Sequence, residues 1–225
     1  PPVNRLFSMR TPSRSPYAGG MLDFVGERAL TIALPIRSFS GGKERLSSSL
    51  SSHQRRALAH QMCTNLLEAV RPFHVIVVTN DTEAEQWAQQ QHVDVVNPDA
   101  GGLNLAADAA RVWARDHHRE QIVIVHSDVP RPEALPLVCA LEGIAIVPDH
   151  QRNGTNVFSL PVDADVEFSY GEGSFRRHVT RASAAARQTP CKLHIVRHHQ
   201  LGLDIDTPND LAHPLAAPAT KEFFS

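Results

Sequence analysis

The chain has 225 residues, of which 42% are apolar and 20% charged, and its formal net charge is -2. This length suffices for one well-filled α/β domain, and the near-neutral charge argues against nucleic-acid binding through a general basic surface. No apolar run approaches the ~20 residues needed to cross a bilayer, and residues 1–20 lack the apolar core of a secretory signal. We therefore expect a cytoplasmic protein with neither nucleic-acid nor membrane partners.

Residues 1–28 are rich in Pro, Ser, Arg and Gly and show little periodicity, so we expect a flexible N-terminal extension there. From Ala29 onward, strand-like apolar runs alternate with helical patterns. The expected strands are 30–36, 73–79, 93–96, 121–125, 144–147, 157–160 and 193–196. The expected helices are 53–70, 82–91, 103–116, 133–141 and 174–187.

Strands rich in Val and Ile with helices between them predict an α/β fold, a mostly parallel, Rossmann-like sheet flanked by helices on both faces. No internal repeat or linker divides the chain. We therefore expect one domain over residues 29–215, followed by a C-terminal tail over residues 216–225. In such sheets, ligands bind beyond the carboxyl ends of the strands.

A loop with the sequence Gly41-Gly42-Lys43-Glu44-Arg45-Leu46 follows the first strand. The two glycines leave room for backbone amides to close on an oxyanion, and Lys43 and Arg45 carry positive charge that would neutralise it. The spacing matches neither the P-loop nor the dinucleotide fingerprint. The loop by itself therefore predicts a polyphosphate-binding site of no particular class.

Asp128 follows the strand 121–125 directly, in Ser127-Asp128-Val129-Pro130. A carboxylate at that edge of the sheet is placed to hold a nucleotide-bound divalent metal. An Asx turn before the proline is an equally good interpretation of this segment alone.

Asp204 and Asp206 flank Ile205 in an extended segment, so both carboxylates should point to one side and the isoleucine to the other. Hard oxygen ligands of this kind suit Mg²⁺ or Mn²⁺. The alternative makes Asp206 a turn residue before a helix that Thr207 caps and that has Asp210 at its third position. We favour a metal for Asp204 and Asp206 and a capping role for Asp210.

Three further loops combine small and polar residues. Gly154-Thr155-Asn156 and Gly171-Glu172-Gly173-Ser174 lie late in the chain, and the second opens a helix, so Ser174 either receives a phosphate or carboxylate or simply caps that helix. Arg176 and Arg177 lie in the first turn of the helix, where the macrodipole disfavours cations, and therefore favour an anionic ligand nearby. Gly101-Gly102-Leu103-Asn104 opens another helix and either contacts a base or ribose or serves only as a helix start.

Cysteine and histidine provide no obvious site. The cysteines Cys63, Cys139 and Cys191 form neither a disulfide framework nor a CxxC pair, and the first two have the pattern of buried free thiols. The spacing of the thirteen histidines matches no zinc site, and we expect most of them to be solvated. His126, near Asp128, is expected to be a satisfied strand-end residue rather than a ligand.

Six segments in a fixed order carry a resemblance to a known family. They are Leu34-Pro35-Ile36-Arg37 with Lys43-x-Arg45-Leu46; Gly102-Leu103-Asn104; Asp128-Val129-Pro130; Gly154-Thr155-Asn156; Tyr170-Gly171-x-Gly173-Ser174-Phe175-Arg176-x-His178; and Leu203-Asp204-Ile205-Asp206-Thr207-Pro208-x-Asp210-Leu211. Together they resemble the guanylyltransferases that activate a phosphorylated three-carbon acid in the biosynthesis of the deazaflavin coenzyme F-420. The resemblance spans about residues 29–211.

The resemblance implies a nucleotidyltransferase fold and the transfer of GMP from GTP to 2-phospho-L-lactate, phosphoenolpyruvate or 3-phospho-D-glycerate, with release of pyrophosphate. It also implies hand-off of the product to a downstream deazaflavin transferase. The sequence leaves open whether the enzyme is a monomer or a homodimer. The site residues it implies fall into groups by role. They are Lys43 and Arg45 for the nucleotide phosphates; Thr155, Gly171 and Ser174 for the acid; and Asp128, Asp204 and Asp206 for Mg²⁺ or Mn²⁺. We expect Lys43, Arg45 and Asp128 to act in catalysis, and from the loop sequences we expect Gly41, Gly42, Gly102 and Asn104 to contact the nucleotide.

Two alternatives remain open at this stage. The first is a cytidylyltransferase or sugar-nucleotide transferase of the same architecture, which a comparison of nucleotide substrates would reveal. The second is a non-catalytic nucleotide-binding relative, which would bind GTP without acceptor-dependent release of pyrophosphate.

Overall fold

The computed structural model describes residues 29–220, so the expected extension over 1–28 and residues 221–225 lie outside the described part. The strands are β1 (Leu30–Pro35), β2 (His74–Val78), β3 (Asp94–Val96), β4 (Gln121–Val125), β5 (Ile144–Pro148), β6 (Thr155–Pro161) and β7 (Leu193–Ile195). The α-helices are α2 (Ser52–Ala69), α3 (Thr82–Gln90), α4 (Leu103–Asp116), α5 (Leu135–Cys139), α6 (Ser174–Gln188), α7 (Pro208–Leu211) and α8 (Ala217–Thr220). Short 3-10 turns occupy Glu44–Leu46, Pro132–Ala134 and Pro214–Ala216.

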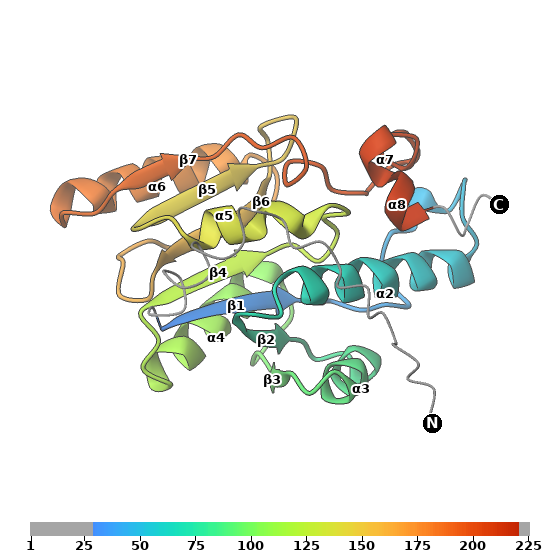
Figure 1. The fold of residues 1–225 in the computed structure, drawn as a ribbon, viewed down its shortest axis with the longest axis horizontal. Helices are drawn as coiled ribbons and strands as arrows, with labels where there is room; N and C mark the ends of the chain where they lie inside the picture. Colours follow the sequence, from blue (N-terminus) through green and yellow to red (C-terminus); the bar gives the residue numbers. More distant parts are fainter. Residues whose placement is uncertain (1–28, 221–225) are drawn as a thin grey trace, which may run out of the picture.

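All seven strands form one sheet in the order β3-β2-β1-β4-β6-β5-β7 (Figure 1). β6 runs antiparallel to both of its neighbours, β4 and β5, whereas every other pair is parallel. The mostly parallel α/β sheet expected from the sequence is therefore confirmed. Because β6 is reversed, its first residues lie at the edge of the sheet where β1, β2, β4 and β5 end.

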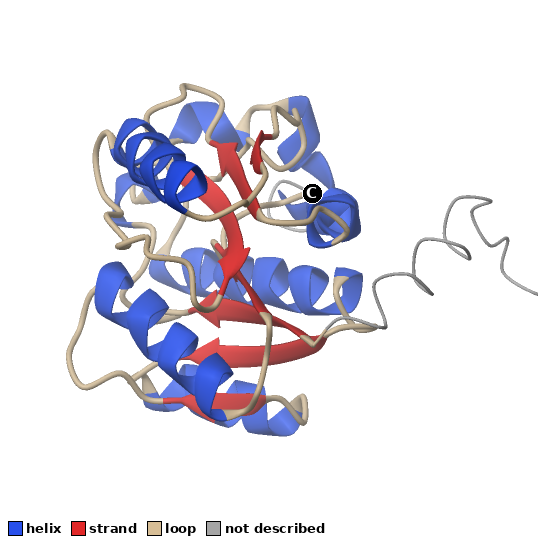
Figure 2. Cartoon of the chain, turned by 90° about the vertical axis from the view of Figure 1, so that its left-hand side faces the viewer, coloured by secondary structure: helices blue, strands red, loops and turns tan. Residues whose placement is uncertain are grey.

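Helices cover the sheet on both faces, as Figure 2 shows. Alternate residues of the strands supply the two cores: Ile32 and Val123 pack on one face with α2, α3 and α5, and Ala33 and Ile122 pack on the other with α4 and α6. Small residues of α4, such as Ala107 and Ala110, allow that helix to lie close to the strands. Burial on both faces explains why the strand sequences are almost continuously apolar.

A third apolar cluster lies on the outer side of α2 and holds the end of the described chain. Leu58 and Met62 of α2 pack there against Ile205, Ala216 and Ala219, all of them buried. The packed part of the chain thus continues through α8 to Thr220, beyond the expected start of a tail at residue 216. This cluster anchors the segment that carries Asp204 and Asp206 next to the sheet.

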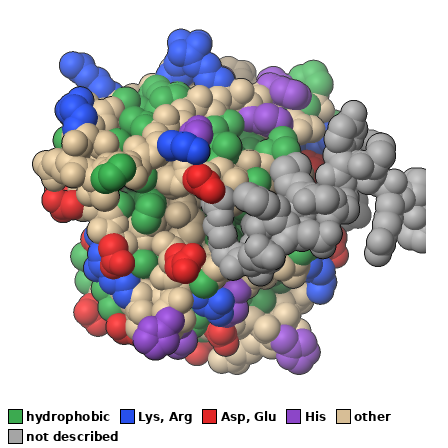
Figure 3. Space-filling model, turned by 60° about the vertical axis from the view of Figure 1, so that its left-hand side comes forward, with side chains coloured by type: hydrophobic (Ala, Val, Ile, Leu, Met, Phe, Trp, Pro, Cys, Tyr) green, Lys and Arg blue, Asp and Glu red, His purple; other side chains and the backbone are tan. Residues whose placement is uncertain are grey.

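On the face drawn in Figure 3, basic side chains stand alone along the upper edge, whereas acidic and basic side chains are interspersed in the lower half. Among the described residues, no helix combines the length and apolar character that crossing a bilayer requires.

Candidate active site

A cavity of about 1090 Å³ opens at the edge of the sheet where the parallel strands end. Its wall contains most of the predicted site residues, namely Arg45, Gly102, Asp128, Thr155, Gly171, Ser174, Asp204 and Asp206. An adjoining cavity of about 350 Å³ is lined by Gly41, Gly42 and Lys43, and it shares Arg45, Asp128 and Asp206 with the larger one. Asn104 lines neither cavity. The volume of the larger cavity slightly exceeds the range of about 300–1,000 Å³ for small-molecule sites, which leaves room for two ligands.

Asp128, Asp204 and Asp206 form the acidic centre of this cavity, with one carboxylate oxygen of each within 4.8 Å of the others. Asp128 follows β4, and its carbonyl accepts a backbone hydrogen bond from Ile205 N at 3.2 Å. This bond holds the 204–206 segment beside the end of β4. Ile205 itself is fully buried, so the alternation inferred from the sequence places both neighbouring carboxylates on the cavity side.

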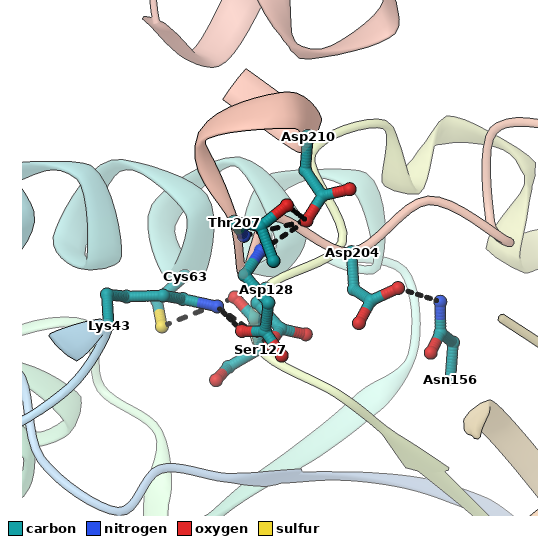
Figure 4. A network of polar contacts seen from close by, with 9 residues as sticks. Lys43, Cys63, Ser127, Asp128, Asn156, Asp204, Thr207 and Asp210 are labelled. Carbon is teal, nitrogen blue, oxygen red and sulfur yellow. Dashed lines mark hydrogen bonds and ion pairs between the residues drawn. The ribbon is translucent and has the colours of Figure 1, made fainter. Parts of the chain in front are cut away.

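A capping interaction fixes Asp206 from behind. One oxygen of Asp210 accepts hydrogen bonds from Asp206 N (3.1 Å), Thr207 N (2.7 Å) and Thr207 Oγ1 (2.8 Å) at the start of α7 (Figure 4). The predicted roles of Thr207 as N-cap and Asp210 as the third helical residue are thus confirmed. Asp206 both precedes the capped helix and faces the other carboxylates, so the two interpretations of this segment are compatible.

Lys43 enters the acidic centre from the loop after β1. Its Nζ lies 2.8 Å from Asp128 Oδ2 and 3.0 Å from Asp206 Oδ1, and only 10% of its side chain is exposed (Figure 4). The backbone of Lys43 has φ 62°, in the left-handed region that non-glycine residues rarely occupy. The sequence suggested a cation directed at phosphate, whereas in the structure this lysine neutralises the carboxylates.

The charges of the centre shift one another's pKa. Burial opposes ionisation of Asp128, but the ammonium of Lys43 holds its pKa below the usual value. Burial alone would lower the pKa of Lys43, but the negative charges of Asp128 and Asp206 raise it. Asp204 forms no ion pair with Lys43, and burial together with the charges of Asp128 and Asp206 raises its pKa to about 7, against a smaller lowering effect of Asn156 and Lys43. The negative charge of Asp204 is thus the one that the described protein groups compensate least.

The donor set fits a divalent cation. Asp128 Oδ1 is buried and has no hydrogen-bond partner among the described residues, although Oδ2 of the same carboxylate binds Lys43. A buried unpaired carboxylate oxygen is costly unless a positive group meets it. Three carboxylates around one point are typical oxygen ligands for Mg²⁺ or Mn²⁺.

The Gly41-Gly42 loop lines the smaller cavity, but part of its backbone is already engaged. Gly41 N donates to Ser38 Oγ at 3.2 Å, so this amide faces its own loop rather than the cavity. Arg37 and Arg45 are exposed, line both cavities and make no ion pair or hydrogen bond within residues 29–220. These two guanidinium groups are the cations best placed to meet an incoming polyanion.

Thr155 and Ser174 lie together in the floor of the larger cavity. Ser174 Oγ donates to Thr155 Oγ1 at 3.5 Å, and His178 Nδ1 lies 3.0 Å from the same oxygen. Thr155 is the first residue of β6, which explains how it comes to line the same cavity as Asp128 and Asp204. The expectation that most histidines are solvated is wrong for His178, which is fully buried.

The loop before α6 is shaped by two glycines with positive φ, Gly171 at 111° and Gly173 at 72°. The Arg177 guanidinium donates to the carbonyls of Ser169 and Glu172 and so ties this loop to the first turn of the helix. The charge of Arg177, which suggested an anionic ligand, is therefore used on backbone carbonyls of the loop.

The two predicted site residues at the start of α4, Gly102 and Asn104, differ in where they lie. Gly102 lines the cavity and has φ 114°. Asn104 Oδ1 accepts a hydrogen bond from Tyr170 N at 2.6 Å, which links α4 to the loop before α6. Asn104 thus supports the loop that forms the cavity wall and does not itself face the cavity.

Several residues that line or brace the cavity have no role in the sequence-based prediction. Asn156 Nδ2 donates to Leu201 O at 3.1 Å and lies 3.4 Å from Asp204 Oδ1, so it orients that carboxylate. Asp149 accepts the amides of Asn153 and Gly154 and shapes the turn before β6. Asn156 could have been found from its place in a Gly-Thr-Asn loop, but no local pattern indicates the role of Asp149.

Sequence comparison places the chain near known enzymes. The family described as "Guanylyl transferase CofC like" matches residues 30–217. A phosphoenolpyruvate guanylyltransferase from Roseiflexus castenholzii is 32% identical over 84% of this chain and 93% of its own length. One from Sphaerobacter thermophilus is 36% identical over 80% of this chain and 90% of its own length.

Structural comparison agrees on the fold. A putative nucleotide-diphospho-sugar transferase from Desulfovibrio desulfuricans G20 superposes with a TM-score of 0.64 at 13% identity. The alignment covers 87% of this chain and 95% of that structure. The predicted nucleotidyltransferase-like architecture is therefore confirmed.

Proposed function

Because the chain belongs to the CofC-like family of guanylyltransferases, we propose that it transfers GMP from GTP to phosphoenolpyruvate and releases pyrophosphate. Support for this acid comes from the two relatives above, both named phosphoenolpyruvate guanylyltransferase. The product, a guanosine diphospho-acid, would pass to the deazaflavin transferase that follows in F-420 biosynthesis.

The observation that carries the proposal is the composition of a single cavity. Its wall combines the acidic centre at the end of β4, two arginines that have no partner among the described residues, and the Thr155–Ser174 pair. A reaction between two polyanions needs sites for both, with positive charge between them. The arginines suit the phosphates of GTP, and the hydroxyl pair with Gly171 suits the smaller acid.

The reaction itself requires alignment and charge neutralisation. An oxygen of the acid's phosphate attacks the α-phosphorus of GTP, and the bond from that phosphorus to the oxygen leading to the β-phosphate breaks, so pyrophosphate leaves. The attacking oxygen is already anionic at neutral pH, and no general base is needed. Holding both ligands in line supplies much of the rate enhancement.

A divalent cation, Mg²⁺ or Mn²⁺, held by Asp128, Asp204 and Asp206, would supply positive charge between the two polyanions. Arg45, with Arg37 beside it, would bind the phosphates that leave as pyrophosphate. Lys43 has three donors, and the carboxylates use two of them, which leaves one for a phosphate oxygen. Gly42 and Gly102 would allow close approach of the nucleotide.

The decisive experiment measures pyrophosphate release with GTP and Mg²⁺ and with each of phosphoenolpyruvate, 2-phospho-L-lactate and 3-phospho-D-glycerate in turn. The deazaflavin transferase is included in parallel reactions so that an unstable product is consumed. We expect release that depends on both GTP and phosphoenolpyruvate and that stops with a chelator. A preference for CTP or UTP would instead identify a different nucleotidyltransferase, and GTP binding without acid-dependent release would identify a non-catalytic relative.

A further inference from the structure

We propose that His178 is a positioning residue that directs the hydroxyl proton of Thr155 into the cavity, where it donates to the phosphorylated acid. The identity of that ligand rests on the proposed function. The arrangement of the hydrogen bonds rests on the structure alone. His178 itself reaches no substrate, because the Thr155 side chain stands between its ring and the cavity.

The backbone determines which ring nitrogen of His178 carries the proton. Ser169 N lies 2.9 Å from His178 Nε2, and both groups are buried. A backbone N–H can only donate, so Nε2 must be the unprotonated, accepting nitrogen. In a neutral imidazole the proton is then on Nδ1.

Nδ1 in turn determines the orientation of Thr155. It lies 3.0 Å from Thr155 Oγ1, and its N–H donates to that oxygen. Ser174 Oγ donates to the same oxygen at 3.5 Å. A hydroxyl has two acceptor positions and one proton. With both acceptor positions taken, the proton of Thr155 has no other described partner and points to the cavity that this residue lines.

The surroundings keep the ring neutral and fixed. Burial, together with the positive charges of Arg177 and Arg181, lowers the pKa of His178 to about 4. The rings of Phe158 and Tyr170 lie 4.6 Å and 4.8 Å from the imidazole, centroid to centroid, and restrict its rotation. A neutral ring held in one orientation presents one tautomer near pH 7.

The orientation matters because carboxylate and phosphate groups only accept hydrogen bonds. With the other tautomer, Thr155 would donate to the histidine and present its lone pairs to the anion. A donor whose proton already faces the ligand needs no reorganisation when the ligand binds. The His178–Thr155 pair therefore favours an acceptor-only ligand at this end of the cavity.

Two substitutions of His178 separate its two hydrogen bonds. The amide of glutamine reaches the position of Nε2, so His178→Gln keeps an acceptor for Ser169 N and loses the donor to Thr155. The amide of asparagine reaches the position of Nδ1, so His178→Asn keeps that donor and loses the acceptor. Melting temperatures of both variants control for general loss of structure.

We expect His178→Gln to raise KM for the acid about tenfold, the effect of one hydrogen bond to a charged group, with little change in kcat or in KM for GTP. His178→Asn should stay closer to the wild type in KM for the acid. In a Thr155→Val background, His178→Gln should have no further effect on that KM, because the residue acts through the hydroxyl. Equal KM increases in both single variants, or an undiminished effect in the Thr155→Val background, would overturn the proposal.

The tautomer is measured separately by NMR of the ¹⁵N-labelled imidazole in the full chain, without any substrate. A proton on Nδ1 supports the positioning role, and a proton on Nε2 contradicts it. If the wild type released no pyrophosphate with any of the three acids but carried the proton on Nδ1, the donor arrangement would stand and the proposed function would fail. The two failures are thus distinguishable.

Discussion

The ammonium of Lys43 lies 2.8 Å from Asp128 Oδ2, although the two residues are 85 positions apart in the chain. The contact joins the loop after β1 to the end of β4, and a second bond from the same nitrogen reaches Asp206 beside α7. One lysine therefore holds together three segments that the chain order keeps far apart. Its charge offsets repulsion between carboxylates that would otherwise face one another in a partly buried site.

Removing this cation should destabilise the protein when divalent metal is absent. We expect Lys43→Met to lower the free energy of unfolding in a chelator by about 3 kcal/mol, because it leaves nearby carboxylates uncompensated. Added Mg²⁺ should recover part of this loss and should stabilise the variant more than the wild type. Urea denaturation with and without Mg²⁺ measures both effects.

Lys192→Met is the matched control for that experiment. Lys192 pairs with Glu142 at 3.3 Å, but the two side chains are 71% and 58% exposed. Exposed pairs contribute little, so the change should stay within about 0.5 kcal/mol. Equal losses in the two lysine variants would show that the acidic centre has no special dependence on Lys43.

The carboxylates are expected to be essential for turnover but not for folding. Asp128→Asn and Asp206→Asn should abolish pyrophosphate release and weaken Mn²⁺ binding, which electron paramagnetic resonance of the titrated ion measures. Circular dichroism should remain that of the wild type. Asp163→Asn changes a carboxylate whose side chain is 89% exposed and should alter neither property. Near-normal turnover in both active-site variants would contradict a metal role for these residues.

The fold could be predicted largely from local patterns, because burial on both faces of a parallel sheet leaves apolar runs that stand out from the helices between them. The reversed direction of β6 could not be predicted, because the apolar sequence of a segment such as 157–160 is equally compatible with a parallel and an antiparallel strand. That reversal is what places Thr155 and Asn156 beside the end of β4, the strand that Asp128 follows. Strand direction depends on packing of the whole sheet, about which a short segment carries no information.

In the candidate site, too, some features were predictable from the sequence and others were not. The pairing of Asp204 and Asp206 follows from alternation along one segment, and their geometry was predictable. The direction of the Lys43 side chain was not, because Lys43 meets partners from two distant segments rather than open solvent. His178 lies in an amphipathic helix, where sequence alone cannot distinguish a buried polar residue from one at the solvent boundary. Its partners, Thr155 and Ser169, are likewise distant in sequence or shaped by a glycine loop.

The raised pKa of Asp204 predicts how stability depends on pH without metal. Its value of about 7 exceeds the ordinary carboxylate value, so the folded state binds a proton that the unfolded state releases near pH 4. In a chelator, the free energy of unfolding contributed by Asp204 should therefore fall as pH rises from about 4 to about 7, on the order of 2 to 4 kcal/mol. The difference between wild type and Asp204→Asn across this range isolates the contribution. A difference that does not vary with pH would contradict the assignment.

The lowered pKa of His178 predicts that stability falls as pH decreases, which is opposite to the effect of Asp204 and covers a partly overlapping pH range. Its pKa is lowered from 6.5 to about 4, so the unfolded state takes up a proton at a pH at which the buried ring remains neutral. The stability it contributes is complete above pH 6.5 and is lost as pH falls through about 4, by up to about 3 kcal/mol. Urea denaturation of wild type and His178→Gln between pH 4 and pH 7 measures this loss, and the gap between the two curves should narrow toward low pH. Since glutamine does not titrate, a constant gap would mean that the imidazole takes up its proton at the same pH in the folded and unfolded protein, which would contradict a buried ring whose Nε2 accepts from Ser169 N.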